Sequence, residues 1–160
     1  MLSVTVLAVG RLKDTFYEDA AAEYLKRLSS YMKVQILEIK AAALPDEPND
    51  AQISAALEKE GAEILKKIPA GAKTVALCIE GKLFSSEELA SFLQKTALSG
   101  QSQLVFLIGG SYGLSDAVKD RADVKLSMSR MTFPHRLARV MLLEQLYRAE
   151  KINANENYHK

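Results

Sequence analysis

The chain has 160 residues, 48% hydrophobic and 26% charged, with a net charge of +1 at pH 7. This is the composition of an ordinary globular protein, and the length predicts one domain spanning residues 1–160. The N-terminal residues lack the basic region of a signal peptide, and their apolar run is too short to cross a bilayer, so we expect no membrane partner. The single cysteine excludes an internal disulfide and favours a reducing, cytoplasmic setting. One cysteine and two distant histidines argue against a structural metal site.

The first half of the chain predicts strands that alternate with helices. Residues 2–9 read as a strand, and Thr15 with Glu18 offers a capping box for a helix that runs to about Tyr31. A strand at 34–39 and a loop with two prolines follow. Asn49 or Asp50 then caps a helix that runs through Ile68.

The second half continues this alternation. The predicted elements are a strand at 74–79, a helix capped by Ser85 with Glu88 and ending near residues 99–100, an apolar strand at 104–108, a short helix at 115–122, a short strand at 124–126, and a helix that begins with Pro134 in its first turn and ends near Ile152. Strands separated by helices predict an α/β fold with a parallel sheet that is covered on both faces. The wholly apolar strand at 104–108 should be buried on both sides.

Ligands of such sheets bind outside the carboxyl ends of the strands. Three segments are expected at that edge: a loop at 80–82, the glycine loop at 109–113, and residues 127–133. If these segments converge, they form one pocket. Both features also allow a purely structural role. The glycine loop could be a tight connection between a strand and a helix without a ligand. Met128, Met131 and Phe133 could fill the core.

Two motif interpretations of the glycine loop are weaker. The loop lacks the Gly-x-Gly-x-x-Gly spacing of a dinucleotide fold, so we exclude a nicotinamide enzyme. Gly109-x-Ser111-x-Gly113 matches the nucleophile elbow of serine hydrolases, and aspartates and histidines follow it in the order of that family. An elbow, however, needs its helix to begin directly after the serine, whereas Ser115 looks like the helix cap here. Labelling of Ser111 would test the esterase alternative.

Positive charge gathers at the C-terminal end of the chain. Residues 125–160 hold seven Lys and Arg against three Asp and Glu, whereas the rest holds fourteen against seventeen. This asymmetry favours an anionic partner near that end. The last helix is apolar on more than one face, which predicts burial by the fold and by a second subunit. Arg139 and Arg148 are about half a turn out of phase, so a dimer could bring one from each subunit to a shared site. For Arg148 the ordinary alternative is an ion pair with Glu144, and for Tyr158 and His159 it is a frayed terminus.

Several motifs together resemble the RlmH family of small SPOUT-superfamily methyltransferases that act on bacterial 23S rRNA. They are the end of the first strand at Gly10, the segment Leu107-Ile-Gly-Gly110, the run from Leu126 to His135, the segment Glu144-Gln-Leu-Tyr-Arg-Ala149, and the terminal Tyr158-His159-Lys160. The resemblance spans the whole chain. It implies a deep trefoil knot in the C-terminal half, a homodimer, S-adenosylmethionine bound in the knot without a metal, and methylation of N3 of a pseudouridine in the assembled ribosome. A knotted protein that binds ribosomes or cofactor without methylating anything stays open as a non-enzymatic alternative.

The resemblance also implies the site residues. The cofactor contacts should fall at Leu77, Gly109 and the loop formed by Met128, Ser129, Arg130, Met131, Thr132 and Phe133. Arg148, Tyr158 and His159 are implied at the methyl-acceptor site. His159 could remove the imide proton, Arg148 could stabilise the anion, and Tyr158 could stack on or hydrogen-bond the base. Cys78 is expected in the core, and the roles of Tyr112 and His135 stay open.

Overall fold

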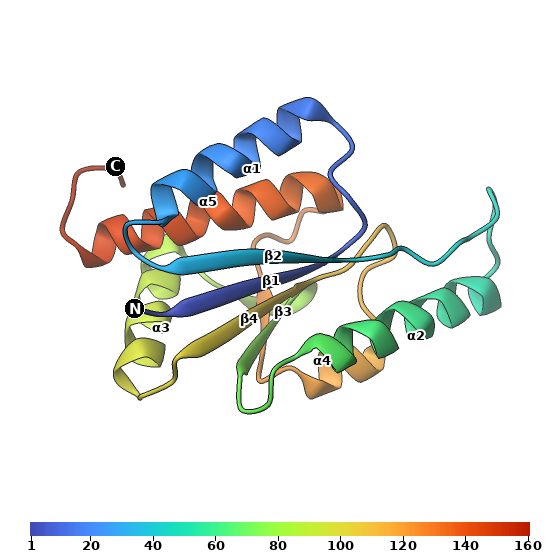
Figure 1. Ribbon diagram of the computed structural model, residues 1–160. Coiled ribbons are helices and arrows are strands. Elements are labelled where there is room, and N and C mark those ends of the chain that lie inside the picture. The colour runs from blue at the N-terminus through green and yellow to red at the C-terminus, as the bar shows by residue number, and fades with distance from the viewer.

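The computed structural model describes residues 1–160 and is an α/β fold (Figure 1). Its elements in chain order are β1 (Ser3–Val9), α1 (Thr15–Leu28), β2 (Lys33–Ile39), α2 (Asp50–Lys67), β3 (Lys73–Leu83), α3 (Ser86–Leu98), β4 (Gln103–Ile108), α4 (Asp116–Arg121), β5 (Val124–Ser127) and α5 (His135–Asn153). The predicted strands and helices are all present.

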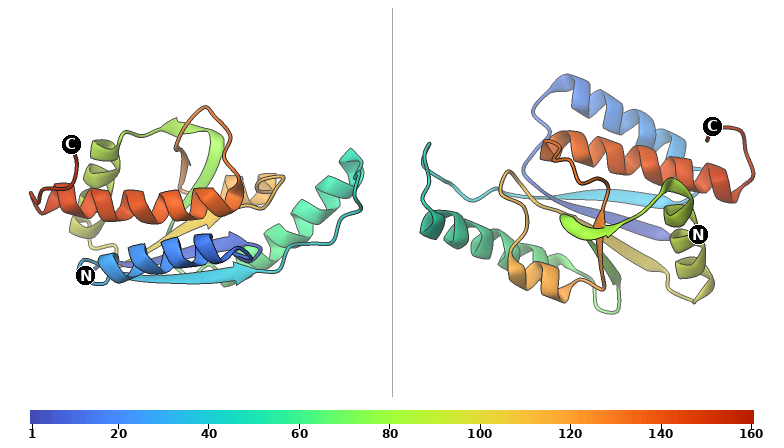
Figure 2. Two further views of the ribbon diagram at one scale, coloured as in Figure 1. Left: turned by 90° about the horizontal axis from the view of Figure 1, so that it is seen from above. Right: turned by 180° about the vertical axis from the view of Figure 1, so that it is seen from behind.

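The five strands form one parallel sheet in the order β2-β1-β4-β3-β5. Helices cover both faces. Helices α1, α3 and α5 lie on one side of the sheet and α2 and α4 on the other, with α5 packed against both α1 and α3 (Figures 1 and 2). The parallel sheet covered on both faces, predicted from the alternation of elements, is confirmed.

The core is divided in two by the central strands. One cluster, with Phe106 and Leu146 fully buried, lies under α1, α3 and α5. The other, with Leu107 and Ile64, lies under α2 and α4. Strand β4 is buried on both faces from Leu104 to Ile108, as its uninterrupted apolar sequence predicts.

The helix caps match the sequence expectations in part. Asn49 caps α2 in a reciprocal box with Gln52, and Ser85 caps α3 in a box with Glu88, as predicted. The capping box expected at Thr15 and Glu18 is wrong. Helix α1 already begins at Thr15, its N-cap is Asp14 without a side-chain cap bond, and it ends at Leu28, short of Tyr31.

Strand β3 is longer than predicted. The expected loop at 80–82 lies within this strand, which pairs with β5 on both sides of a bulge: Leu126 is the partner of Leu77 and again of Lys82. The pairing resumes after the bulge, so the strand continues to Leu83. The glycine is required there, because a Cβ on Gly81 would lie 2.7 Å from the carbonyl carbon of Lys125. The polar Glu-Gly-Lys sequence therefore marks a bulge and not a turn.

Helix α5 is tied to the far edge of the sheet by Arg139. This side chain is 3% exposed, donates from Nη1 to Glu38 at 2.7 Å and from Nη2 to the Gly10 carbonyl oxygen at 3.0 Å. Its Nε has no partner. Arg139 therefore fixes α5 against the ends of β1 and β2 within one chain, and the expectation that it faces a shared dimer site is wrong.

Candidate functional site

A cavity of about 840 Å³ opens at the carboxyl edge of the sheet. Its walls come from the bulge of β3, the glycine loop after β4, and the segment that joins β5 to α5. This volume lies in the usual range of small-molecule sites. The convergence predicted for the ends of these strands is therefore found.

Seven of the eight residues implied as cofactor contacts line this cavity. They are Leu77, Gly109, Met128, Ser129, Met131, Thr132 and Phe133. Arg130 is exposed and does not line the cavity. Two hydrogen bonds shape the loop, from the Ser127 hydroxyl to the Ser129 carbonyl oxygen at 2.9 Å and from the Met131 amide to the Ser129 hydroxyl at 3.0 Å.

The glycine loop is held in a tight turn. Gly110 and Gly113 form a bridge, closed by a bond from the Gly113 amide to the Gly110 carbonyl oxygen, and Gly113 has a φ of +82°. A Cβ on Gly109 would lie 2.3 Å from the carbonyl carbon and oxygen of Gly113. Only glycine allows this approach, which places bare backbone against the cavity.

The nucleophile elbow is absent. Ser111 is exposed in the turn, and α4 begins only at Asp116 with Ser115 as its N-cap. The Ser115 hydroxyl accepts from the Val118 amide at 3.2 Å, so it is the cap that the sequence predicted. The geometry of a serine esterase is therefore missing from this loop.

Two further residues line the cavity that the sequence did not predict to do so. Cys78 lines the cavity instead of the core, and burial raises the pKa of its thiol. His135, whose role the sequence left open, is half-buried against the cavity. Burial, with Arg136 and Arg139 nearby, lowers its pKa, so the imidazole is neutral at pH 7.

The C-terminal residues are docked on the protein surface and not frayed. We call Glu87, Glu144, Arg148, Tyr158 and His159 the C-terminal cluster. Arg148 donates to Glu144 from Nε at 2.9 Å and from Nη2 at 2.6 Å, and its guanidinium lies 4.7 Å from the centre of the Tyr158 ring. The Tyr158 hydroxyl donates to Glu144 at 3.1 Å. His159 lies with Nε2 2.7 Å from Glu87 and Nδ1 3.3 Å from Arg148.

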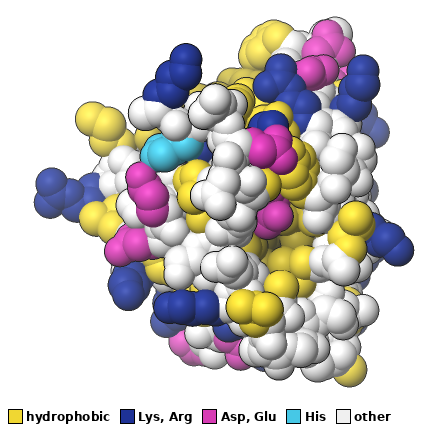
Figure 3. Space-filling model, turned by 90° about the vertical axis from the view of Figure 1, so that its left-hand side faces the viewer, with side chains coloured by type: hydrophobic (Ala, Val, Ile, Leu, Met, Phe, Trp, Pro, Cys, Tyr) yellow, Lys and Arg dark blue, Asp and Glu magenta, His cyan; other side chains and the backbone are white.

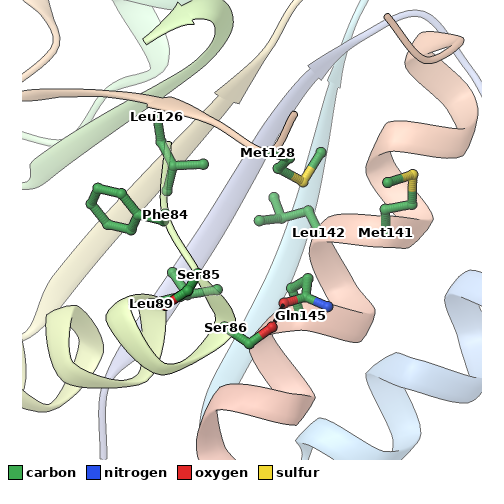
Figure 4. Close-up of a pocket in the computed structure, with 9 residues that line it drawn as sticks. All are labelled: Phe84, Ser85, Ser86, Leu89, Leu126, Met128, Met141, Leu142 and Gln145. Carbon is green, nitrogen blue, oxygen red and sulfur yellow. Dashed lines mark hydrogen bonds between the residues drawn. The ribbon is translucent and has the colours of Figure 1, made fainter. Parts of the chain in front are cut away.

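The structure thus brings the three implied acceptor-site residues together, but none of them lines the large cavity of the same chain. A smaller cavity of about 290 Å³ lies between the N-terminus of α3 and α5 (Figure 4). It shares Leu126 and Met128 with the large cavity. On its other side, Ser86 donates to Gln145, and Gln145 donates to Glu144 of the cluster.

The surface around the termini mixes charges of both signs (Figure 3). No helix is long and apolar enough to cross a membrane. No group of three or more His, Cys, Asp or Glu side chains is placed to hold a metal ion.

The fold and the cavity define the class of protein. A protein-family model described as a predicted SPOUT methyltransferase matches residues 2–159 of the sequence. The chain therefore belongs to this family. Among curated proteins, the chain is 50% identical to a protein of Pelotomaculum thermopropionicum over 99% of both chains. It is 46% identical to proteins of Bacillus pumilus and Carboxydothermus hydrogenoformans over 99% of this chain and all of theirs. All three are named ribosomal RNA large subunit methyltransferase H, which confirms the resemblance that the motifs indicated.

A solved structure shares the fold. The crystal structure of a probable methyltransferase from Bordetella pertussis Tohama I superposes with a TM-score of 0.57 at 15% identity, over 92% of this chain and 95% of that chain. At this identity the likeness concerns the fold alone.

Proposed function

We propose that this protein transfers a methyl group from S-adenosylmethionine to N3 of a pseudouridine in 23S rRNA, and that it acts as a homodimer on the assembled ribosome in the cytoplasm. The observation that carries the proposal is the near-complete match, at 46–50% identity, to proteins named as large-subunit rRNA methyltransferases. The gathering of the implied cofactor residues around one cavity supports it. A deep trefoil knot around this cavity is part of the same proposal.

The cavity suits S-adenosylmethionine. Its apolar lining from Leu77, Met128 and Phe133 can enclose an adenine ring, and the bare backbone at Gly109 and Gly110 leaves room for the methionine portion. A neutral His135 in the wall avoids repulsion of the positive sulfonium. S-adenosylmethionine supplies an activated methyl group when bound, so we expect the reaction to need no metal.

The C-terminal cluster suits the acceptor base. An imide nitrogen is a good nucleophile once it has lost its proton, and His159 can take that proton. The Arg148 guanidinium can stabilise the resulting anion. The pKa of Tyr158 is raised to about 12 by burial and by the charge of Glu144, so its phenol serves as a hydrogen-bond donor or stacking surface and not as a base at neutral pH.

A second copy is needed to join these two parts. In one chain the cluster does not line the large cavity, whose rim exposes Ile79, Tyr112 and Met131 at 49%, 48% and 73%. Such exposed apolar side chains around a concave site are typical of an interface. We therefore place the C-terminal cluster of one subunit over the cavity of its partner.

Mixing two variants tests this arrangement, at a cofactor concentration that saturates the wild type but lies far below the dissociation constant of Gly109→Ala. Gly109→Ala damages the cavity and His159→Ala damages the cluster. If the subunits share sites, a mixed dimer has one intact site, and an equal mixture that exchanges subunits freely should regain about a quarter of the wild-type rate. If each chain uses its own cluster, the mixture stays inactive.

The nearly neutral chain has few charges with which to grip bare RNA. Recognition should therefore depend on the shape of the assembled ribosome. The basic C-terminal segments of the two subunits, residues 125–160, would contact phosphates together, so activity should fall steeply with salt. Radiolabelled methyl transfer to intact ribosomes, separated subunits and free 23S rRNA tests this, with ribosomes purified from cells that lack the protein. Label confined to intact ribosomes supports the proposal. Equal labelling of a naked stem-loop contradicts the ribosome requirement, and no label in any RNA contradicts the proposed function.

A further inference from the structure

The side chains of the C-terminal cluster form a closed chain of hydrogen bonds that reaches back to α3. Ser86 contacts Gln145, Gln145 contacts Glu144, Glu144 holds Arg148, and Arg148 contacts His159, which in turn contacts Glu87. Ser86 and Glu87 are neighbours in the first turn of α3, so the chain returns to its starting point. Figure 4 shows Ser86 and Gln145 next to each other in the wall of the small cavity.

Glu144 is the centre of this network. Its Oε1 accepts from Arg148 twice and from the Tyr158 hydroxyl, and its Oε2 accepts from Gln145 at 2.7 Å. The carboxylate is only 18% exposed. It thereby fixes two of the three acceptor-site side chains at once, and it leaves Nη1 as the part of the guanidinium that faces His159.

The contacts also select one tautomer of the neutral His159 ring. An arginine can only donate, so the Nδ1 atom that faces Arg148 must carry the lone pair. The proton of the neutral ring is then on Nε2, where it donates to the Glu87 carboxylate at 2.7 Å. Glu87 therefore holds the imidazole in the tautomer whose basic nitrogen is Nδ1.

The link between Arg148 and His159 is the longest in the network, at 3.3 Å. A donor and a basic nitrogen side by side match the edge of a cyclic imide, which offers a carbonyl oxygen next to an N–H. The imide N–H would donate to Nδ1 of His159 while the neighbouring carbonyl oxygen accepts from Nη1 of Arg148. The imide proton then passes to Nδ1 and its electron pair stays on the ring nitrogen, which becomes the nucleophile.

We propose that Glu144 and Glu87 are positioning residues of the methyl-acceptor site, and that the Arg148–His159 edge they hold is where the imide face of a uracil-type base inserts. This inference rests on the proposed function, because it assigns the site its substrate edge. Neither carboxylate lines the large cavity, so neither should affect cofactor binding.

The test compares Glu144→Gln, Glu144→Asp and Glu87→Ala with the wild type, and uses Glu63→Gln as the matched control. Glu63 forms an exposed ion pair with Lys66 on α2, on the opposite side of the sheet. Single-turnover methylation at saturating cofactor should fall about 100-fold in Glu144→Gln, since small misplacements of catalytic groups cost rates of that order. Glu144→Asp should restore part of the rate, and Glu63→Gln should match the wild type. The dissociation constant for S-adenosylmethionine should change little in all four variants, and thermal unfolding checks that each variant is folded at the assay temperature.

A second readout does not depend on activity. The chain has two histidines, so ¹H–¹⁵N correlation spectra of the imidazoles can be assigned with a His135→Gln variant. We expect the Nε2–H tautomer for His159 in the wild type and a mixture of tautomers in Glu87→Ala. A wild-type Nδ1–H tautomer, or a Glu144→Gln variant that methylates at the full rate, would overturn the inference. An inactive wild type that shows the expected tautomer would instead count against the proposed function and leave the positioning geometry supported.

Discussion

The replacement of Gly109 by alanine probes the cofactor cavity most sharply. The added Cβ would lie 2.3 Å from the carbonyl carbon and oxygen of Gly113 and 2.8 Å from its Cα. Because carbon atoms pack at about 3.5–4.0 Å, the backbone at residue 109 and the backbone at Gly113 would have to move apart by roughly 1 Å. The obstacle is backbone, which cannot rotate away as a flexible side chain would.

The expected cost follows from this geometry. Overpacking of a tight interior costs about 1–3 kcal/mol, and a backbone clash belongs at the upper end of that range. If cofactor binding requires the native turn, about 3 kcal/mol corresponds to roughly a 150-fold loss of affinity. Isothermal titration of S-adenosylmethionine into the folded variant measures this loss directly.

A matched control separates the turn from general destabilisation. Gly100 has a φ of +86° and no atoms within 4 Å of an added Cβ. Gly100→Ala should therefore cost about 1–2 kcal/mol of stability through backbone strain alone and leave cofactor affinity unchanged. A folded Gly109→Ala variant that binds the cofactor within a few-fold of the wild type would refute the reasoning.

Further predictions follow from the same contacts. The raised pKa of Tyr158 means that its phenol stays protonated up to about pH 12, while an unfolded tyrosine ionises near pH 10. The contribution of this residue to stability is therefore present below pH 10 and falls between about pH 10 and 12. The ¹³Cζ chemical shift of Tyr158 should accordingly show no titration below pH 10. The lowered pKa of His135 means that the unfolded chain takes up a proton before the folded chain as the pH falls below about 6.5. The free energy of unfolding should therefore decrease below that pH in the wild type, and decrease less in His135→Gln. Urea denaturation at several pH values measures this difference. Glu38→Ala leaves the buried Arg139 with only the Gly10 carbonyl oxygen, and because Glu38 is partly exposed we expect a loss of about 2–3 kcal/mol by chemical denaturation; a loss below 0.5 kcal/mol would contradict the role given to this pair. The raised thiol pKa of Cys78 predicts slow alkylation at neutral pH, slowed further by S-adenosylmethionine, and cofactor-independent labelling would place the cysteine outside the binding site.

Much of the fold could be predicted because local signals agreed with the tertiary structure. The apolar run at 104–108 has no polar face and can only be a central strand, and Asn49 and Ser85 announce their helices through reciprocal caps. The bulge in β3 could not be seen, because Glu80-Gly81-Lys82 has the composition of a turn. Only the packing of Gly81 against β5 shows that the strand continues.

The site was predictable to a different degree in its two parts. Strand ends of a parallel sheet meet at one edge, so the convergence of Leu77, Gly109 and the 128–133 loop followed from the order of elements. The docking of Tyr158 and His159 could not be predicted from the order of elements. It depends on Glu87, which is 72 residues from His159 in sequence. Acidic residues in the first turn of a helix are common, and this one carried no separate signal.

The most direct test of the central claim is the chemical state of 23S rRNA in cells. The rRNA of a strain that lacks this protein would be digested to nucleosides and fragments and analysed by mass spectrometry, with the wild-type gene, Gly109→Ala or His159→Ala restored. The account predicts that one N3-methylated pseudouridine is absent in the deletion strain, returns with the wild-type gene, and does not return with either variant. An unchanged pattern of methylated pseudouridines in the deletion strain would contradict it.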